Sequence, residues 1–280
     1  MIKKIRSFAD KYAILTAFIA FIVFDLLLLG LGRLLSLLPQ TLPMDYLKEF
    51  ILIIVPIAIV FFFGFSRVFK NGSLLRGLLC LLPLIIWELL MLGNFFLKNL
   101  GNPEANWKPW YLIVYGVFTV VGIGIREECI YRATIQNIVA KKHANSVKGI
   151  WLTVFVSAII FGLCHVPNLF FGMQPLAVFS QVVSATFIGL LFGAVYLRSG
   201  SVWALILIHT LIDIGSLAKS VFLDSHDIEI ANQLSFSWAS LIFYLILFGL
   251  TAFLLRPSKC NQIYENLCFA DEKSEATTRA

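Results

Sequence analysis

The sequence has little charge. Only 14% of its 280 residues are Asp, Glu, Lys or Arg, whereas 59% are hydrophobic and the mean hydropathy is +0.88. A soluble domain carries nearer a quarter of charged residues, so this composition excludes an ordinary soluble fold. Apolar runs of roughly 18–22 residues recur along the chain, and each is long enough to cross a bilayer. The sequence therefore predicts an all-α, polytopic membrane protein.

Other features are scarce as well. The five cysteines form no pair at metal-ligand spacing, and a disulfide framework is not expected. The net charge of +6 could indicate nucleic-acid binding, but the basic residues lie between the apolar runs and no basic-aromatic patch accompanies them. The expected partner is therefore the lipid bilayer and not nucleic acid. Because neither a linker nor an internal repeat divides the chain, residues 1–280 are expected to form a single membrane domain.

We expect about eight transmembrane helices, since that many apolar segments reach spanning length. They lie near residues 13–33, 49–66, 74–97, 111–139, 149–166, 176–197, 202–223 and 234–255. The polar residues 256–280 are expected to form a cytoplasmic tail.

The basic residues are distributed unevenly between the two sets of loops that these spans define. Fifteen Lys and Arg residues fall on the side of the two termini and five on the other side. By the positive-inside rule, this asymmetry predicts that both termini are cytoplasmic, with the even number of spans that this requires.

Three clusters of polar residues lie inside the predicted spans, where ionisable side chains are costly and therefore indicate function. Glu128 and Arg132 are four residues apart and can pair on one helix face, which leaves Glu127 about 100° away and free for chemistry. A carboxylate in apolar surroundings suits general acid–base catalysis. The other clusters are Phe161-Gly-Leu-Cys-His165, with Pro167 expected to end its helix, and His209-Thr-Leu-Ile-Asp213.

The depth of these clusters supports a common site. With a rise of about 1.5 Å per residue from the basic loops, Glu127, His165, His209 and Asp213 all lie roughly 16–25 Å into the bilayer. We therefore expect the fourth, fifth and seventh spans to converge on one buried chamber. Asp25 and Glu88 are interpreted as helix contacts or cavity lining, and Gly189 and Gly193 as marks of close helix packing.

Taken together, the three clusters resemble the CAAX protease and bacteriocin-processing (CPBP, or Abi) family, which includes the type II CAAX prenyl endopeptidases. The pattern is found here, in order, as Glu127-Glu128-x-x-x-Arg132, Phe161-x-x-x-His165 and His209-x-x-x-Asp213. The resemblance covers about residues 110–225. The third motif ends in Asp where the prenyl endopeptidases usually have Asn, which fits the bacterial branches better, including those associated with bacteriocin maturation or self-immunity.

The resemblance implies an intramembrane endopeptidase that acts on a membrane-associated or lipidated protein or peptide. Glu127 would be the general base and His165 would hold the water, while His209 and Asp213 would bind a metal or stabilise the oxyanion. Glu128 is counted with these four among the catalytic residues and would shape the site, with Arg132 and Phe161 as supporting residues. A divalent metal such as zinc, held by residues among His165, His209, Asp213 and Glu127, and a metal-free glutamate mechanism are both open. The family branch also implies a bacterial cell membrane.

Two other functions are open on the sequence alone. Intramembrane Glu, His and Asp also act as proton relays in transporters, although the repeat typical of many transporters is missing from the sequence. A non-catalytic bacteriocin immunity protein that keeps the motifs is the other alternative. Because His-Glu-x-x-His does not occur, a zinc protease of the soluble type is not predicted.

Overall fold

The structure is a computed structural model, and it describes residues 2–224 and 238–267. Strand pairing among these residues is limited to one isolated antiparallel bridge between Trp107 and Leu223. Everything else with regular structure is helical, so the predicted all-α fold is confirmed.

The elements follow one another along the chain with short connections. In chain order they are α1 (Ile2–Lys11), α2 (Ala13–Leu35), α3 (Leu42–Phe63), the 3-10 turn η1 (Ser66–Phe69), α4 (Leu74–Cys80), α5 (Leu82–Asn99), α6 (Trp110–Ile130), the π-helical turn η2 (Tyr131–Gln136), α7 (Asn137–His143), α8 (Val147–Leu163), the 3-10 turn η3 (Val166–Phe171), α9 (Pro175–Ser199), α10 (Val202–Ser216), α11 (Ala218–Phe222), α13 (Trp238–Leu254), the 3-10 turn η4 (Pro257–Lys259) and α14 (Cys260–Asn266).

The helices have the length and apolarity of a polytopic membrane protein. Among the described residues, five helices are long and apolar enough to cross a bilayer, or six if α13 and the segment Pro257–Asn266, bent by 55°, count as one span. Helix α10 is apolar but has only 15 residues. Each of the eight predicted segments is mainly helical in its described part, and residues 234–237 of the last one lie outside the described residues.

Some predicted boundaries were wrong, for physical reasons that the structure shows. Helix α3 begins at Leu42 and not near 49, because the polar residues of its first turns are paired: Asp45 binds Lys48 at 2.8 Å, and Glu49 binds Arg126 of α6 at 2.6 Å. The predicted span 74–97 is divided at Leu81, which separates α4 from α5. The segment from residue 256, which stays predicted to be a cytoplasmic tail, contains η4 and the helix α14, whose Ile263 is fully buried.

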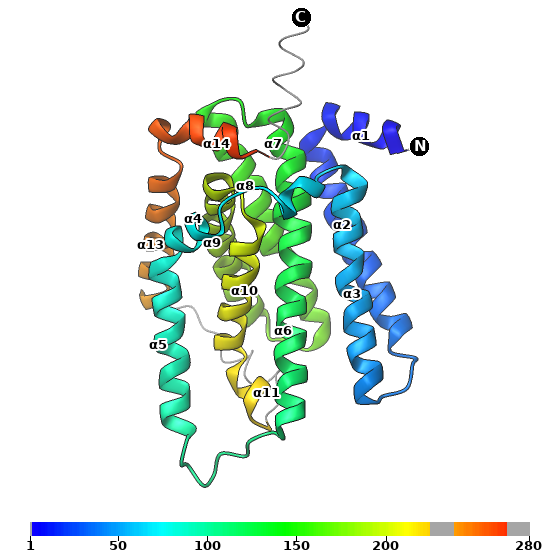
Figure 1. The fold of residues 1–280 in the computed structure, drawn as a ribbon, viewed down its shortest axis with the longest axis vertical. Coiled ribbons are helices and arrows are strands. Elements are labelled where there is room, and N and C mark those ends of the chain that lie inside the picture. The colour runs from blue at the N-terminus through cyan, green and yellow to red at the C-terminus, as the bar shows by residue number, and fades with distance from the viewer. Residues whose placement is uncertain (1, 225–237, 268–280) are drawn as a thin grey trace, which may run out of the picture.

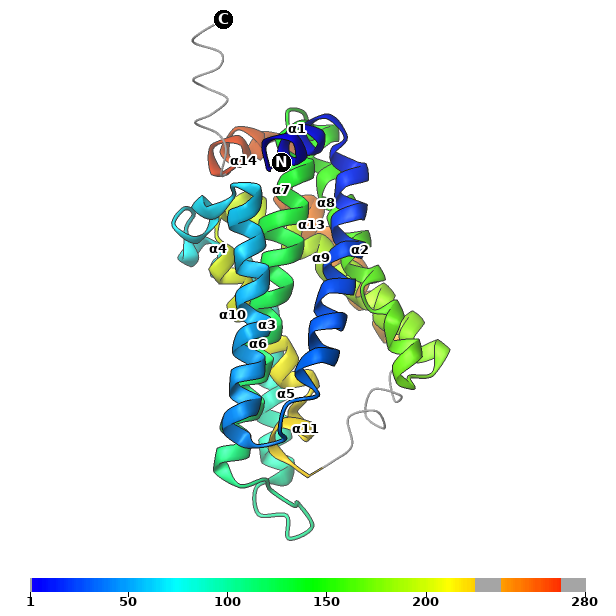
Figure 2. The ribbon, with the colours of Figure 1, turned by 90° about the vertical axis from the view of Figure 1, so that its right-hand side faces the viewer.

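Helix α6 lies at the centre of the arrangement, between α3 and α10 (Figure 1). Helices α8 and α9 form an antiparallel hairpin beside it, and α13 packs on the outer side of α9 (Figure 2). Helices α1 and α14 lie at the same end of the molecule, opposite the connection between α5 and α6 (Figure 1). One continuous rod, α6–η2–α7, therefore passes the length of the bundle and carries the first predicted motif.

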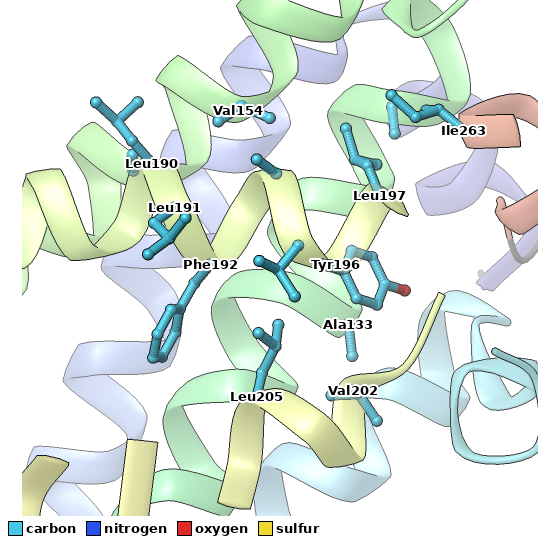
Figure 3. Close-up of a cluster of buried hydrophobic side chains, with 14 of the residues drawn as sticks. Ala133, Val154, Leu190, Leu191, Phe192, Tyr196, Leu197, Val202, Leu205 and Ile263 are labelled. Atoms are coloured by element: carbon cyan, nitrogen blue, oxygen red, sulfur yellow. The ribbon is translucent and has the colours of Figure 1, made fainter. Parts of the chain in front are cut away.

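The hydrophobic core is built around α9. Its residues Leu190, Leu191, Phe192, Tyr196 and Leu197 contact side chains of neighbouring elements (Figure 3). The neighbours drawn are Ala133 of η2, Val154 of α8, Val202 and Leu205 of α10 and Ile263 of α14. Many large apolar side chains of α2, α5 and α13 are exposed instead, as expected for helix faces that contact lipid.

Glycines allow the helices around the site to approach closely. A Cβ atom added to Gly124 of α6 would lie 2.8 Å from Thr210 Oγ1 and 3.2 Å from the Ile206 carbonyl oxygen of α10. A Cβ atom at Gly189 would lie 3.1 Å from Ala158 Cα, so the predicted packing role of this glycine is confirmed. The backbone contact at Gly124 places α10 directly against the motif that follows in α6.

Candidate active site

The two adjacent glutamates at the end of α6 have different surroundings. Glu128 is completely buried, whereas the Glu127 side chain keeps 25% of its surface exposed. Consecutive helical residues point about 100° apart, and this separates the two carboxylates between the protein interior and a cavity. The structure therefore shows the predicted difference between the two carboxylates, with Glu128 buried and Glu127 accessible.

Glu128 is the centre of a buried polar network that joins α6, η2 and α10. Its Oε1 accepts a hydrogen bond from Arg132 Nη1 at 3.2 Å and lies 2.7 Å from His209 Nδ1. Arg132 is also fully buried, and its guanidinium carbon lies 4.3 Å from the centre of the Phe161 ring. Removing charges from water is costly unless they are paired and hydrogen-bonded, so this network fixes the position of the His209 ring.

Arg132 lies in the π-helical turn η2, which the sequence analysis missed. A π turn leaves backbone carbonyls without their usual α-helical donors. Two hydroxyl groups compensate: Thr134 Oγ1 donates to the Cys129 carbonyl at 2.9 Å, and Ser157 Oγ of α8 donates to the Tyr131 carbonyl at 3.1 Å. Hydroxyl residues at these positions are too common in sequences to have signalled the turn.

His209 presents its second nitrogen to two further carboxylates. Its Nε2 lies 3.5 Å from Glu127 Oε2 and 3.7 Å from Asp213 Oδ2. The ring is held edge-on between Phe161 and Phe192, with centroid distances of 5.8 and 5.7 Å. The predicted convergence of α6 and α10 at this point is confirmed.

His165 follows the last turn of α8, where η3 begins with Pro167 close behind. Its Nδ1 lies 3.2 Å from the Phe161 carbonyl oxygen and 3.3 Å from Cys164 Sγ. Because a carbonyl oxygen can only accept, Nδ1 carries the hydrogen in the neutral ring, and Nε2 keeps its lone pair. The second motif thus supplies one nitrogen acceptor.

These residues line one cavity of about 300 Å³. Its lining comes from α6, α8, η3, α9 and α10 and consists of Ile123, Glu127, Cys164, His165, Asn168, Gln181, His209, Asp213, Ser216 and Leu217. Four of the five predicted catalytic residues therefore share a chamber, and the fifth, Glu128, lies behind it as the partner of His209. Phe161 and Arg132 form the wall between the two histidines.

The sequence analysis missed the two amide side chains of the lining, Asn168 and Gln181. Asn168 Nδ2 donates to Gln181 Oε1 at 2.8 Å, which ties η3 to α9 in the wall of the cavity. Asn168 lies three residues after His165, and that spacing was a signal that could have been used. Both side chains can offer hydrogen bonds to a peptide backbone.

A second cavity, of about 440 Å³, adjoins the first, because Cys164 and Asn168 line both. Its other walls are α2, α3 and η3, and Asp25 of α2 is part of its lining, in agreement with the predicted role of Asp25 as cavity lining. Arg126 also lines it, neutralised by Glu49 at 2.6 Å. Glu88, the other acid predicted to line a cavity or contact a helix, lies in α5. Its carboxylate packs against Gly215 of α10, since a Cβ atom added to Gly215 would lie 2.8 Å from Glu88 Oε2.

A zinc site requires at least three of the predicted ligands to lie around one point. Nowhere in residues 2–224 and 238–267 are three or more His, Cys, Asp or Glu side chains placed so that they could hold a metal ion together. His165 Nδ1 is turned to its own helix, and His209 Nδ1 is engaged by Glu128. Contacts of this kind leave Nε2 of each ring for the cavity, so zinc binding stays a prediction.

Comparison with known protein families points to the same region. Residues 108–215 match the family model described as type II CAAX prenyl endopeptidase Rce1-like. This segment is therefore similar to the Rce1-like family. The resemblance predicted from the three motifs is thus confirmed. The matched segment runs from α6 through all but the last residue of α10, and it holds every residue that lines the 300 Å³ cavity except Ser216 and Leu217. At the level of the family, the match supports a CAAX-type intramembrane protease.

Searches of the curated proteins and of the solved structures found no significant match.

Proposed function

We propose that this chain is an intramembrane endopeptidase that hydrolyses a peptide bond of a lipidated or membrane-associated protein, with a water molecule activated by Glu127. The observation that carries the proposal is the shared cavity: Glu127, His165, His209 and Asp213 face one chamber of about 300 Å³ within an Rce1-like segment. A chamber of this size falls at the lower end of small-molecule sites, which suits a short stretch of peptide.

In the proposed mechanism, Glu127 and His165 Nε2 hold the water by accepting its two hydrogens. Glu127 takes one proton as the oxygen attacks the carbonyl carbon, and the carbonyl oxygen becomes an oxyanion. Glu127 then gives this proton to the leaving amine as the carbon–nitrogen bond breaks. The products are one carboxylic acid and one amine, so atoms and charge balance.

His209 is proposed to stabilise the oxyanion. With Nδ1 donating to Glu128, the imidazolium form of His209 offers its Nε2 hydrogen to the cavity. Asp213 and Glu128 supply the compensating negative charge, at 3.7 and 2.7 Å from the ring. Arg132 in turn holds Glu128 in place, so Glu128 and Arg132 are positioning residues in this proposal.

The test uses the full chain purified in lipid nanodiscs and a quenched fluorescent peptide that carries a farnesylated Cys-aliphatic-aliphatic-X end. The wild type is expected to cleave it, and Glu127→Gln is expected to lose about 10²–10⁴-fold in rate, the usual contribution of a general base. Glu265→Gln, an exposed glutamate of α14, is the matched control and should keep full activity. Equal activity of Glu127→Gln and wild type would refute the proposal.

Further arms separate the alternatives predicted from the sequence. The same peptide without the farnesyl group, and casein, report whether lipidation is required. A wild-type protein that cleaves none of these substrates but moves protons across a proteoliposome membrane would be a transporter. One that does neither, while protecting cells from a bacteriocin, would be an immunity protein.

The steps above pass through no metal, and chelation tests this part of the proposal. Treatment with EDTA and then 1,10-phenanthroline is expected to leave peptide cleavage unchanged, because in the proposed steps His165 Nε2 accepts from the water and His209 Nε2 donates to the oxyanion, so neither nitrogen serves a metal ion. Loss of cleavage that is restored by added zinc would instead support the predicted zinc site and would require His165 or His209 to reorient.

A further inference from the structure

We propose that the end of the molecule that carries α1 and α14 binds the phosphate of an anionic phospholipid in a basic pocket. The pocket is a cavity of about 370 Å³ that shares no lining residue with the two cavities at the candidate active site. Four cationic side chains line it, and no Asp or Glu does so in the part of the chain that the structure describes. The four are Arg76, Arg198, Arg256 and Lys259.

Arg198 is the observation that calls for an anion. It lies in the last turn of α9 with only 8% of its surface exposed. Its Nε and Nη1 atoms are buried and have no hydrogen-bond partner among the described residues. A buried guanidinium without an anionic partner is strongly destabilising, so a group with acceptor oxygens is expected in the cavity.

The nearby backbone acceptors are already engaged. The Leu197 and Arg198 carbonyl oxygens accept from Asn266 Nδ2 of α14, at 3.3 and 2.7 Å, and the Ser199 carbonyl accepts from Ser73 N at 2.8 Å. These contacts hold the end of α9 between α4 and α14. They leave Nε and Nη1 of Arg198 without an anionic partner among the described residues.

The walls of the pocket are rigid. The loop before α4 crosses the loop after α9 so closely that a Cβ atom on Gly72 would lie 2.2 Å from the Gly200 carbonyl carbon, and both glycines have positive φ. The 55° bend between α13 and Pro257–Asn266 turns Arg256 and Lys259 toward Arg198. Arg256 is fixed further by a 2.7 Å hydrogen bond to the Phe253 carbonyl.

The remaining lining is apolar and selects a lipid over a soluble phosphate. It consists of Leu79, Cys80, Pro83, Leu250, Phe253 and Leu254. Leu79 and Phe253 are 59% and 61% exposed and belong to the outward faces of α4 and α13. Cations at one end and an apolar wall that opens outward match a phosphate headgroup above acyl chains.

The test measures thermal stability of the full chain in detergent with added phosphatidylglycerol. We expect the midpoint temperature to rise with phosphatidylglycerol, and neutral phosphatidylcholine to have no such effect. In Arg198→Gln, the phosphatidylglycerol concentration needed for half of the rise is expected to increase about tenfold, as for loss of a charged hydrogen bond. Lys148→Gln, an exposed cation outside the pocket, is the control and should respond as the wild type does.

Arg198 is buried, so its replacement could prevent folding, and a rim variant keeps the proposal testable. The double variant Arg256→Gln with Lys259→Gln should fold and should also weaken the lipid response about tenfold, since each cation near a headgroup adds to binding. A wild-type response in this variant overturns the proposal. Equal protection by glycerol phosphate and by the lipid would show a simple anion site instead. Protection that appears only after residues 268–280 are removed would overturn the proposal and identify this C-terminal segment as the occupant.

Discussion

At the scale of single residues, the site depends on how the buried charges are paired. Glu128, Arg132 and His209 are all nearly or completely excluded from solvent. Removing one member of a buried pair leaves an uncompensated charge, which costs more than the pair itself contributes. Lys141 of α7 forms an exposed ion pair with Asp10 of α1 at 3.1 Å. Removing one member of this pair costs little, because water solvates the charge that is left.

Arg132→Met is therefore expected to destabilise the protein by about 3–5 kcal/mol, whereas Lys141→Met should cost about 0–1 kcal/mol. Unfolding in detergent, followed by circular dichroism, compares the two. Adding Glu128→Gln to Arg132→Met should recover part of the loss, because the neutral amide no longer needs a cation. If the two single variants unfold at the same temperature, the buried network does not stabilise the fold as described.

At the scale of elements, the contact between α6 and α10 decides whether the site forms. Glu128 reaches His209 at 2.7 Å only because Gly124, one turn before it, lets the α10 backbone approach. Gly116 on the same helix makes no such contact: a Cβ atom there would have Val221 Cγ1, at 3.6 Å, as its nearest neighbour. The two glycines thus form a matched pair for experiment.

Gly124→Ala is expected to destabilise the protein by about 1–3 kcal/mol through overpacking and to lower the cleavage rate, because α10 must move away from Glu128. Gly116→Ala should be neutral or slightly stabilising, since alanine favours helix over glycine. Midpoint temperatures and cleavage of the farnesylated peptide are measured for both. Full activity in Gly124→Ala would show that the close contact is not needed for the site.

At the scale of the whole molecule, the arrangement has a direction. Helices α1 and α14 lie at one end with the turn between α7 and α8, and the connection between α5 and α6 lies at the other (Figure 1). Lys141 and Asp10 link α7 to α1 across this end. The positive-inside rule predicts that this end is cytoplasmic.

Reporter fusions test the orientation. In a bacterial host, alkaline phosphatase fused after Asn102, between α5 and α6, is expected to be active because it lies outside the cytoplasm, and a fusion after Asn145, between α7 and α8, is expected to be inactive. The reverse pattern would contradict the predicted topology and would place the basic pocket against the outer leaflet.

The sequence determined the class of the protein and the identity of its polar residues. Composition required a membrane fold, and the spacing of Glu128 and Arg132 determined their pairing, because both follow from local rules of helix geometry and of solvation in lipid. The spacing of His209 and Asp213 likewise places them on one face of α10. These features need no knowledge of which helices are neighbours.

Only the tertiary structure decided what those residues contact. The pairing of Arg126 with Glu49, the place of Asn168 and Gln181 at the cavity, and the π turn that carries Arg132 depend on α3, α8 and α9 meeting α6 and its extension η2. The two nitrogens of Arg198 that lack a partner among the described residues are likewise visible only once α4, α9, α13 and α14 are together. The reason is that these contacts join residues far apart in the chain, and no local pattern encodes which distant side chain will neutralise a buried charge.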